Sequence, residues 1–254
     1  MLKFFSIAIC ALMFLSCSSQ SSNAQIIVEI PTIEQEATSI WRTINDIEFL
    51  EGQGYNIHLP EHAVIDSLIE KSKNKTFGNS DFESIYTLLE SGVYSKSTYE
   101  AAFEKVNLQK ELINSLVTRL KHTRDQWKWK FKTFEAYKIV FTLYGTGGSY
   151  DPDLGIVTLF TNKDGRFMNY DSPANTILHE IVHMGIEESI VQKFNLSHGL
   201  KERIVDTITY LLFKEELPDY RIQQMGDPKI DQYLSNIDDL GRLSILIKEY
   251  QEEN

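Results

Sequence analysis

Cysteine, basic charge and long hydrophobic runs are all scarce in this sequence of 254 residues. The only two cysteines are Cys10 and Cys17, so the chain beyond them has no thiol for a disulfide, a thiolate metal site or a cysteine nucleophile. The 25 Lys and Arg residues stand against 36 Asp and Glu, which gives a formal net charge of −11, and no dense Lys/Arg block occurs. These deficits argue against a nucleic-acid partner and leave His and carboxylate side chains to hold any metal ion.

The one hydrophobic run of note extends from Phe4 to Leu15 and is too short to span a bilayer. With Lys3 before it, the run has the layout of a secretory signal. Ser16-Cys17 at its end resembles a bacterial lipobox. We therefore expect a lipoprotein-type signal peptide over residues 1–16, lipidation of Cys17, a polar tether over residues 17–25, and an exported protein anchored in the bacterial cell envelope. Cleavage after Ala24 by an ordinary signal peptidase is the alternative.

The remaining chain has the composition of a folded domain, because 42% of all residues are hydrophobic and 11% aromatic. Four segments have apolar residues at helical spacing and are predicted to be helices: residues 32–49, 63–71, 82–89 and 97–124. Three segments are typical of β-strands: residues 25–29, residues 128–143 with a break near Glu135, and residues 156–161. A turn-dense stretch over residues 145–155 is expected to be a hairpin connection. We predict an α+β fold, mostly helical with a small antiparallel or mixed sheet, and an N-terminal helical region over residues 26–96.

One motif is directly associated with chemistry. Ser172-Pro173 is a typical helix start, with Ser as the cap and Pro in the first turn, and the helix that follows contains His179-Glu180-Ile181-Val182-His183. Imidazoles at positions i and i+4 lie on one face and can bind a single Zn²⁺, while the Glu beside the first can reach a water on the metal. The rest of that helix is largely apolar, so a metal ion would compensate the buried polar groups.

A catalytic zinc ion needs a third protein ligand. Glu187 is a poor choice, because one ion cannot be reached comfortably from three successive turns of one helix. The next predicted helix, residues 199–213, places Glu202 and Asp206 at i and i+4. Glu202 can be the third ligand, and Asp206 can accept the free ring N–H of a ligand histidine. His198 is the alternative third ligand.

The sequence resembles the gluzincin metallopeptidases, the thermolysin-like clan, whose signature is HExxH followed further along the chain by a helical ExxxD. The first part corresponds to His179 through His183 and the second to Glu202-Arg-Ile-Val-Asp206. The resemblance implies that His179, His183 and Glu202 bind Zn²⁺, that Glu180 is the general base, and that Asp206 orients His179.

The same resemblance implies a zincin-like domain over residues 97–254, in which the long helix from residue 97 backs the active site. It also implies that substrate lies as an added strand along residues 155–161. The family has a downstream His or Tyr that stabilises the transition state, and His198, Tyr210 and Tyr220 are the candidates here. Lys201 departs from the family pattern, in which Asn often precedes the glutamate. The metzincin signature does not fit, because the chain has Ile186 and Ser189 where that signature requires Gly and His.

The sequence thus predicts a zinc-dependent metallopeptidase with a peptide or protein substrate, held at the membrane through lipidated Cys17 and without a nucleic-acid partner. The alternatives are a non-catalytic binding lipoprotein on the same scaffold and a zinc-binding protein. Glu180 favours the enzyme, because a purely structural site needs no acid beside the metal and closes its fourth position with another ligand.

Overall fold

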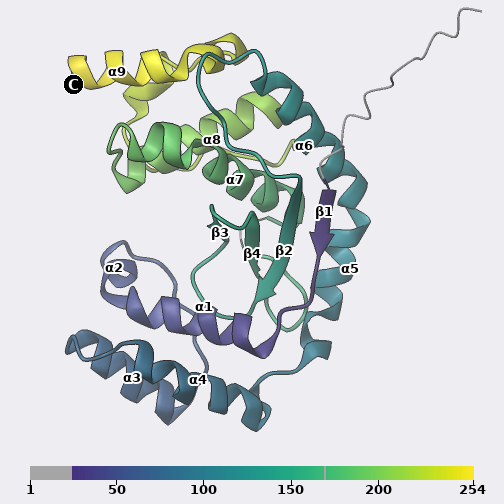
Figure 1. Cartoon of the computed structure of the whole chain (residues 1–254), viewed down its shortest axis with the longest axis vertical. Coiled ribbons are helices and arrows are strands. Elements are labelled where there is room, and N and C mark those ends of the chain that lie inside the picture. The colour runs from purple at the N-terminus through teal and green to yellow at the C-terminus, as the bar shows by residue number, and fades with distance from the viewer. Residues whose placement is uncertain (1–24, 169) are drawn as a thin grey trace, which may run out of the picture.

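The computed structural model describes residues 25–168 and 170–254, and this part of the chain is mostly helical with a small mixed sheet (Figure 1). The predicted α+β class is confirmed. The expected signal peptide, the lipidation site Cys17 and nearly all of the expected tether lie outside the described residues. Within the described ranges, no helix combines the length and apolar character needed to pass through a bilayer.

The sheet is built from strands that lie far apart in the sequence: β1 (Gln25–Val28), β2 (Ala136–Thr142), β3 (Ser149–Asp151) and β4 (Ile156–Phe160). Their order is β1-β2-β4-β3, in which β1 and β4 run parallel to β2 and β3 runs antiparallel to β4. Ile26 of β1 belongs to the same apolar core as Ile139 of β2 and Val157 of β4. The first described residues are therefore part of the central sheet, and Ile26 packs in the core of the sheet.

Two expectations about the sheet are wrong. The stretch over residues 145–155, predicted to be a connection only, contains β3, which is too short to show an alternating pattern. The resemblance placed substrate along residues 155–161, but β4 has β2 on one side and β3 on the other. Because β3 already pairs with residues 156–158, the strand edge available along this part of the sheet is that of β3.

The strand predicted over residues 128–143 begins only at Ala136. The preceding residues use their backbone N–H groups elsewhere: Lys128 donates to the carbonyl of Gly241 at 3.1 Å, and Lys132 donates to that of Gly185 at 2.9 Å. Phe131 of this segment is buried in the core. The alternation of aromatic residues in the sequence therefore reflects a packed connection whose hydrogen bonds go to helix ends and loops.

The first group of helices has its own apolar cluster, which includes Ile40, Ile65 and Ile85. Its members are α1 (Ile33–Asn45), α2 (Ile47–Gly52), α3 (Ala63–Lys73) and α4 (Phe82–Leu88), with short turns η1 (Asn79–Asp81), η2 (Leu89–Val93) and η3 (Lys96–Tyr99). α1 begins with a capping box, in which the Thr32 side chain accepts from the backbone of Gln35 and the Gln35 side chain accepts from that of Thr32.

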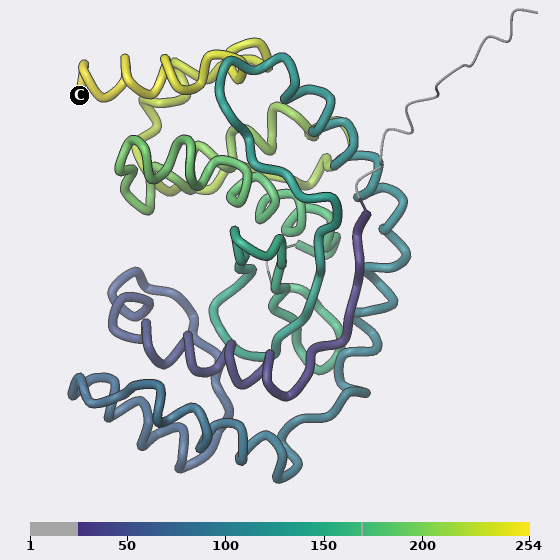
Figure 2. The backbone as a smooth tube through the Cα atoms, in the orientation of Figure 1, coloured from purple at the N-terminus to yellow at the C-terminus, as the bar shows by residue number. Residues whose placement is uncertain are grey.

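The second group of helices packs around the sheet and forms the main core. Its members are α5 (Glu100–Leu108), α6 (Lys110–Arg124), α7 (Pro173–Ile186), α8 (His198–Phe213) and α9 (Leu243–Glu253), with η4 (Glu187–Gln192), η5 (Pro228–Gln232) and η6 (Ile237–Arg242). Figure 2 shows that the segments of α1–α2 and of α7–α8 lie on opposite sides of the β3 loop.

The long helix predicted over residues 97–124 is wrong, because the chain turns at Gln109 and forms α5 and α6. The Gln109 side chain accepts a hydrogen bond from the backbone N–H of Ala174 at 3.1 Å and from the hydroxyl of Ser172 at 2.9 Å. Ser172 occupies the predicted cap position of α7, but its own side chain does not cap the helix. A glutamine distant in the sequence therefore caps α7, and the helix break puts it in place.

Candidate metal centre

The two histidines of the HExxH motif converge with a glutamate of the neighbouring helix. His179 and His183 lie on α7, and Glu202 reaches them from α8. The Nε2 atoms of the two histidines are 3.0 Å apart, and Oε2 of Glu202 lies 3.3 Å from Nε2 of His183 and 3.5 Å from Nε2 of His179. These three side chains could hold a metal ion, as the sequence predicts.

The spacing of the three atoms suits a tetrahedral ion. Metal–ligand bonds of about 2.0–2.1 Å at tetrahedral angles place the ligand atoms about 3.3 Å from one another. The observed separations of 3.0, 3.3 and 3.5 Å bracket this value. Two imidazole nitrogens and one carboxylate oxygen are also ligands that Zn²⁺ accepts, and three protein ligands leave a fourth position for water or substrate. The residues present are therefore compatible with a zinc site.

A second set of contacts fixes the orientation of His179. Its Nδ1 atom lies 2.7 Å from the hydroxyl of Tyr220 and 3.2 Å from Oδ1 of Asp206. The Tyr220 hydroxyl donates its own proton to Oδ1 of Asp206 at 2.8 Å, so its oxygen is left to accept from His179. Nδ1 of His179 therefore carries a proton, and Nε2 points toward the other two atoms of the cluster. Asp206 lies where the sequence predicts it.

His183 is positioned by an aromatic ring of the edge strand. The ring of Tyr150, on β3, stacks on the His183 imidazole with 5.0 Å between centroids and 11° between planes. The Tyr150 hydroxyl donates to Oε2 of Glu187 at 2.8 Å, which anchors the ring over the site. In the described part of the chain, Nδ1 of His183 has no hydrogen-bond partner, so packing determines the orientation of this imidazole.

The Glu180 carboxylate lies against the loop before β3. A Cβ atom built on Gly148 would lie 2.4 Å from Oε1 of Glu180, so this carboxylate rests directly on the loop backbone. No residue in the described ranges donates a hydrogen bond to it, which leaves both oxygens free to accept a proton from a water or a substrate.

Burial sets the direction of the pKa shift for two groups of the site, and hydrogen bonds set it for the other two. It raises the pKa of Glu180 to about 7, partly opposed by the neighbouring charge of His179. Burial likewise lowers the pKa of His183 to about 4. Although burial also acts to lower the pKa of His179, hydrogen bonds to Asp206 and Glu202 raise it to about 10. For Glu202, burial favours the neutral form, but hydrogen bonds to His179 and His183 hold its pKa well below the usual range.

The cluster opens into a cleft with a volume of about 480 Å³. One wall comes from α7 and α8, and the opposite wall comes from the first group of helices through Phe49, Leu50 and Tyr55. Gly147 and Gly148 of the loop before β3 form its side. The cleft therefore lies between the two groups of helices, which the sequence does not reveal, because α2 and the loop after it carry no motif.

The structure separates the three candidates for transition-state stabilisation. His198 lines the cleft, where its Nε2 is 2.8 Å from the hydroxyl of Tyr55. Its Nδ1 lies 3.8 Å from Oε1 of Glu202, and it is not part of the group that could hold a metal ion, so Glu202 is the third member. Tyr220 lies behind His179 on Asp206, and Tyr210 is 36% exposed and outside the cleft.

The chain matched no family model, no curated protein and no solved structure, so the interpretation of this site rests on its own geometry.

Proposed function

We propose that the protein is a zinc-dependent peptidase that hydrolyses peptide bonds with Glu180 as general base. The observation that supports this most directly is the Glu180 carboxylate, which is free of hydrogen bonds from the described residues and lies in an open cleft beside three side chains suited to zinc. A structural zinc site has no use for such a group, because its fourth position is closed by a ligand.

Bound zinc would polarise the scissile carbonyl and stabilise negative charge on its oxygen. Glu180 takes a proton from the attacking water and passes it to the leaving amine. His179, Glu202 and His183 would hold the zinc ion, and the hydrogen bonds of Tyr220 and Asp206 to Nδ1 of His179 orient its ring so that Nε2 faces the other two side chains. His198 and Tyr55 face the same cleft and can donate hydrogen bonds to the substrate carbonyl. A peptide added at the edge of β3 would pass directly in front of these groups.

We also propose that the protein is exported to the bacterial cell envelope and anchored there by a lipid on Cys17. The support is the lipobox-like end of the hydrophobic run over residues 4–15. The wild-type chain is expected in the membrane fraction after cell lysis and the Cys17→Ser variant is not. A wild-type chain without N-terminal acyl groups by mass spectrometry would refute the anchor.

The peptidase proposal is tested by metal content and turnover in the same preparations. We expect one zinc per chain in the wild type and in Glu180→Gln, a large loss of zinc in Glu202→Ala, and hydrolysis of a peptide library only by the wild type. Zinc in the wild type and in Glu180→Gln, with no turnover by either, would favour the alternative of a binding lipoprotein or zinc-binding protein. Undiminished turnover by Glu180→Gln would refute the role of the general base.

A further inference from the structure

A second pocket of about 250 Å³ adjoins the metal cleft, and the function proposed above gives it no role. The two share Arg42, Leu50 and the loop residues from Thr146 to Tyr150. The second pocket lies on the other face of the sheet. Successive side chains of β4 point to opposite faces: Val157 packs in the core beside α7, whereas Ile156 and Thr158 line the pocket. The two cavities thus meet around the edge of β3.

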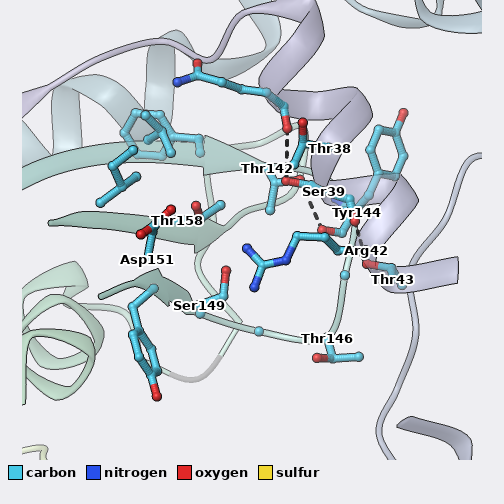
Figure 3. A pocket seen from close by; sticks show the side chains of 18 of the residues that line it. Thr38, Ser39, Arg42, Thr43, Thr142, Tyr144, Thr146, Ser149, Asp151 and Thr158 are labelled. Carbon is cyan, nitrogen blue, oxygen red and sulfur yellow. Dashed lines mark hydrogen bonds between the residues drawn. The ribbon is translucent and has the colours of Figure 1, made fainter. Parts of the chain in front are cut away.

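Arg42 is the positively charged side chain that lines this pocket. It belongs to the last turn of α1, and Figure 3 shows it extending toward Ser149 of β3. Within the described residues, Arg42 forms no ion pair. The last turn of a helix favours a cation of any kind, but this does not account for a guanidinium that extends across a pocket.

Two carboxylates also line this pocket, and neither lies within ion-pair distance of Arg42. Asp46 accepts a hydrogen bond from Asn45 at 2.8 Å. Asp151 accepts from the backbone N–H groups of Asp153 and Leu154 at 2.9 and 3.0 Å. In the adjoining cleft, the Nζ atom of Lys201 lies 3.6 Å from Oε1 of Glu202. Of the Lys and Arg side chains that line the two cavities, Arg42 is therefore the one that has no carboxylate partner among the described residues.

Several hydroxyl groups also line the pocket. The hydroxyls of Thr38, Ser39 and Thr43 donate to carbonyls of α1. Those of Thr146, Ser149 and Thr158 have no hydrogen-bond partner in the part of the chain that the structure describes. Ser149 and Thr158 are paired across β3 and β4, so their side chains lie next to each other on the sheet. A guanidinium with free hydroxyl donors beside it is an arrangement that binds a carboxylate.

We infer that Arg42 and its hydroxyl-lined pocket form a subsite for a carboxylate of the substrate, so that the peptides cleaved are acidic next to the scissile bond. The inference rests on the proposed peptidase function. Successive side chains of an added strand point to opposite faces of a sheet. A peptide along β3 that presents one residue to the metal cleft therefore presents the next to Arg42. The carboxylate is either the side chain of Asp or Glu or the C-terminal carboxylate of a short peptide.

The test uses three peptides of the same core sequence, all incubated with the full-length zinc-loaded protein. The first has Glu next to the cleaved bond and an amidated C-terminus, the second has Gln there and an amidated C-terminus, and the third has Gln there and a free C-terminus. We expect the wild type to favour the first or the third over the second by about tenfold in kcat/KM. The favoured peptide identifies the source of the carboxylate.

The selectivity ratio is then compared among variants, because a ratio measured within one preparation does not depend on its folded fraction. Arg42→Ala is expected to reduce the ratio to near unity, through a higher KM for the carboxylate peptide, and Arg42→Glu to invert it. Arg242→Ala removes an exposed arginine of η6 and serves as the matched control. A wild type that does not discriminate, or Arg42→Ala with the wild-type ratio, would overturn the inference.

Binding separates this inference from the peptidase proposal. Fluorescence anisotropy of the same labelled peptides is measured with Glu180→Gln and with the double variant that also carries Arg42→Ala. The subsite would be supported if Glu180→Gln bound a carboxylate peptide with a Kd about tenfold lower than that of the second peptide and the double variant did not. This holds even if the wild type cleaved nothing. Equal Kd values for all three peptides in the first protein would refute the subsite, whatever the turnover.

Discussion

At the scale of single residues, the position of the Glu180 carboxylate depends on the absence of a side chain at Gly148. A Cβ atom there would lie 2.4 Å from Oε1 of Glu180 and 2.8 Å from Cγ2 of Thr176. Both separations are shorter than van der Waals contact, and Thr176 is attached to the same rigid helix as Glu180. The carboxylate would have to move away from its place in the cleft to accommodate a methyl group.

We therefore expect Gly148→Ala to reduce kcat/KM by about a hundredfold, because a shift of a catalytic group by about 1 Å has an effect of that order. The zinc content should remain that of the wild type, since none of the three ligand side chains contacts this position. The measurement is turnover of a cleaved peptide together with zinc per chain. Gly52→Ala is the control, because nothing lies within 4 Å of the Cβ atom added there. Wild-type turnover by Gly148→Ala would contradict the placement of Glu180.

The residues that could hold a metal ion were predictable because helical periodicity places each pair on one face of its own helix. Two residues at i and i+4 on one helix need no knowledge of the fold, and Glu202 with Asp206 repeats that spacing on the next helix. Tyr150 and Tyr55 were not predictable, because each reaches the site from a segment without periodicity. Tyr220 was expected as a candidate that faces substrate, but its hydroxyl faces Asp206 and His179 from behind.

At the scale of elements, the start of α7 depends on a side chain from the break between α5 and α6. The Gln109 side chain accepts a hydrogen bond from the backbone N–H of Ala174 in the first turn of α7. It also accepts a hydrogen bond from the hydroxyl of Ser172, which precedes the helix. Apolar spacing predicts one continuous helix here, since Gln109 leaves the hydrophobic pattern intact. The break occurs where Gln109 makes tertiary hydrogen bonds, and a local pattern contains no information about these.

Gln109→Ala is expected to lower the free energy of unfolding by about 1 kcal/mol, as the loss of a helix cap does. For a chain of this size, the melting temperature should fall by about 2–4 °C. Gln109→Glu keeps the acceptor and adds a negative charge at the N-terminus of α7, so it should recover the wild-type value or exceed it. Thermal unfolding followed by circular dichroism measures both variants. Equal destabilisation by Ala and Glu would show that the side chain acts by packing alone.

At the scale of the whole molecule, a buried carboxyl group joins the first group of helices to the sheet. Glu36 of α1 is fully buried, and its Oε1 accepts hydrogen bonds from the hydroxyl of Tyr99 and from the backbone N–H of Leu143. Its Oε2 has no partner among the described residues. The metal cleft lies between the same two groups of helices, with Phe49 and Tyr55 on the wall opposite α7 and α8.

Burial raises the pKa of Glu36 above its ordinary value of 4.5, although the hydrogen bond from Leu143 acts in the opposite direction. The folded chain therefore retains this proton at a pH at which the unfolded chain has lost it. The contribution of Glu36 to stability is greatest below about pH 4.5 and decreases as the pH rises toward the folded pKa, by about 1.4 kcal/mol for each pH unit of that interval. Above the folded pKa, the folded state contains a buried and only partly compensated charge.

Glu36→Gln removes this ionisation and keeps an oxygen that can accept from Leu143 and Tyr99. The melting temperature of the variant minus that of the wild type should therefore increase from pH 4 to pH 8. The other titrating groups are the same in both proteins, so their contributions cancel in this difference. Glu34→Gln, which removes an exposed carboxylate from the same helix, controls for the change in net charge. A difference between Glu36→Gln and wild type that stays constant from pH 4 to pH 8 would mean that Glu36 ionises equally in the folded and unfolded chains. In that case the carboxyl group of Glu36 would be exposed to solvent in the folded chain, and the contact between α1 and the sheet would not bury it as the structure shows.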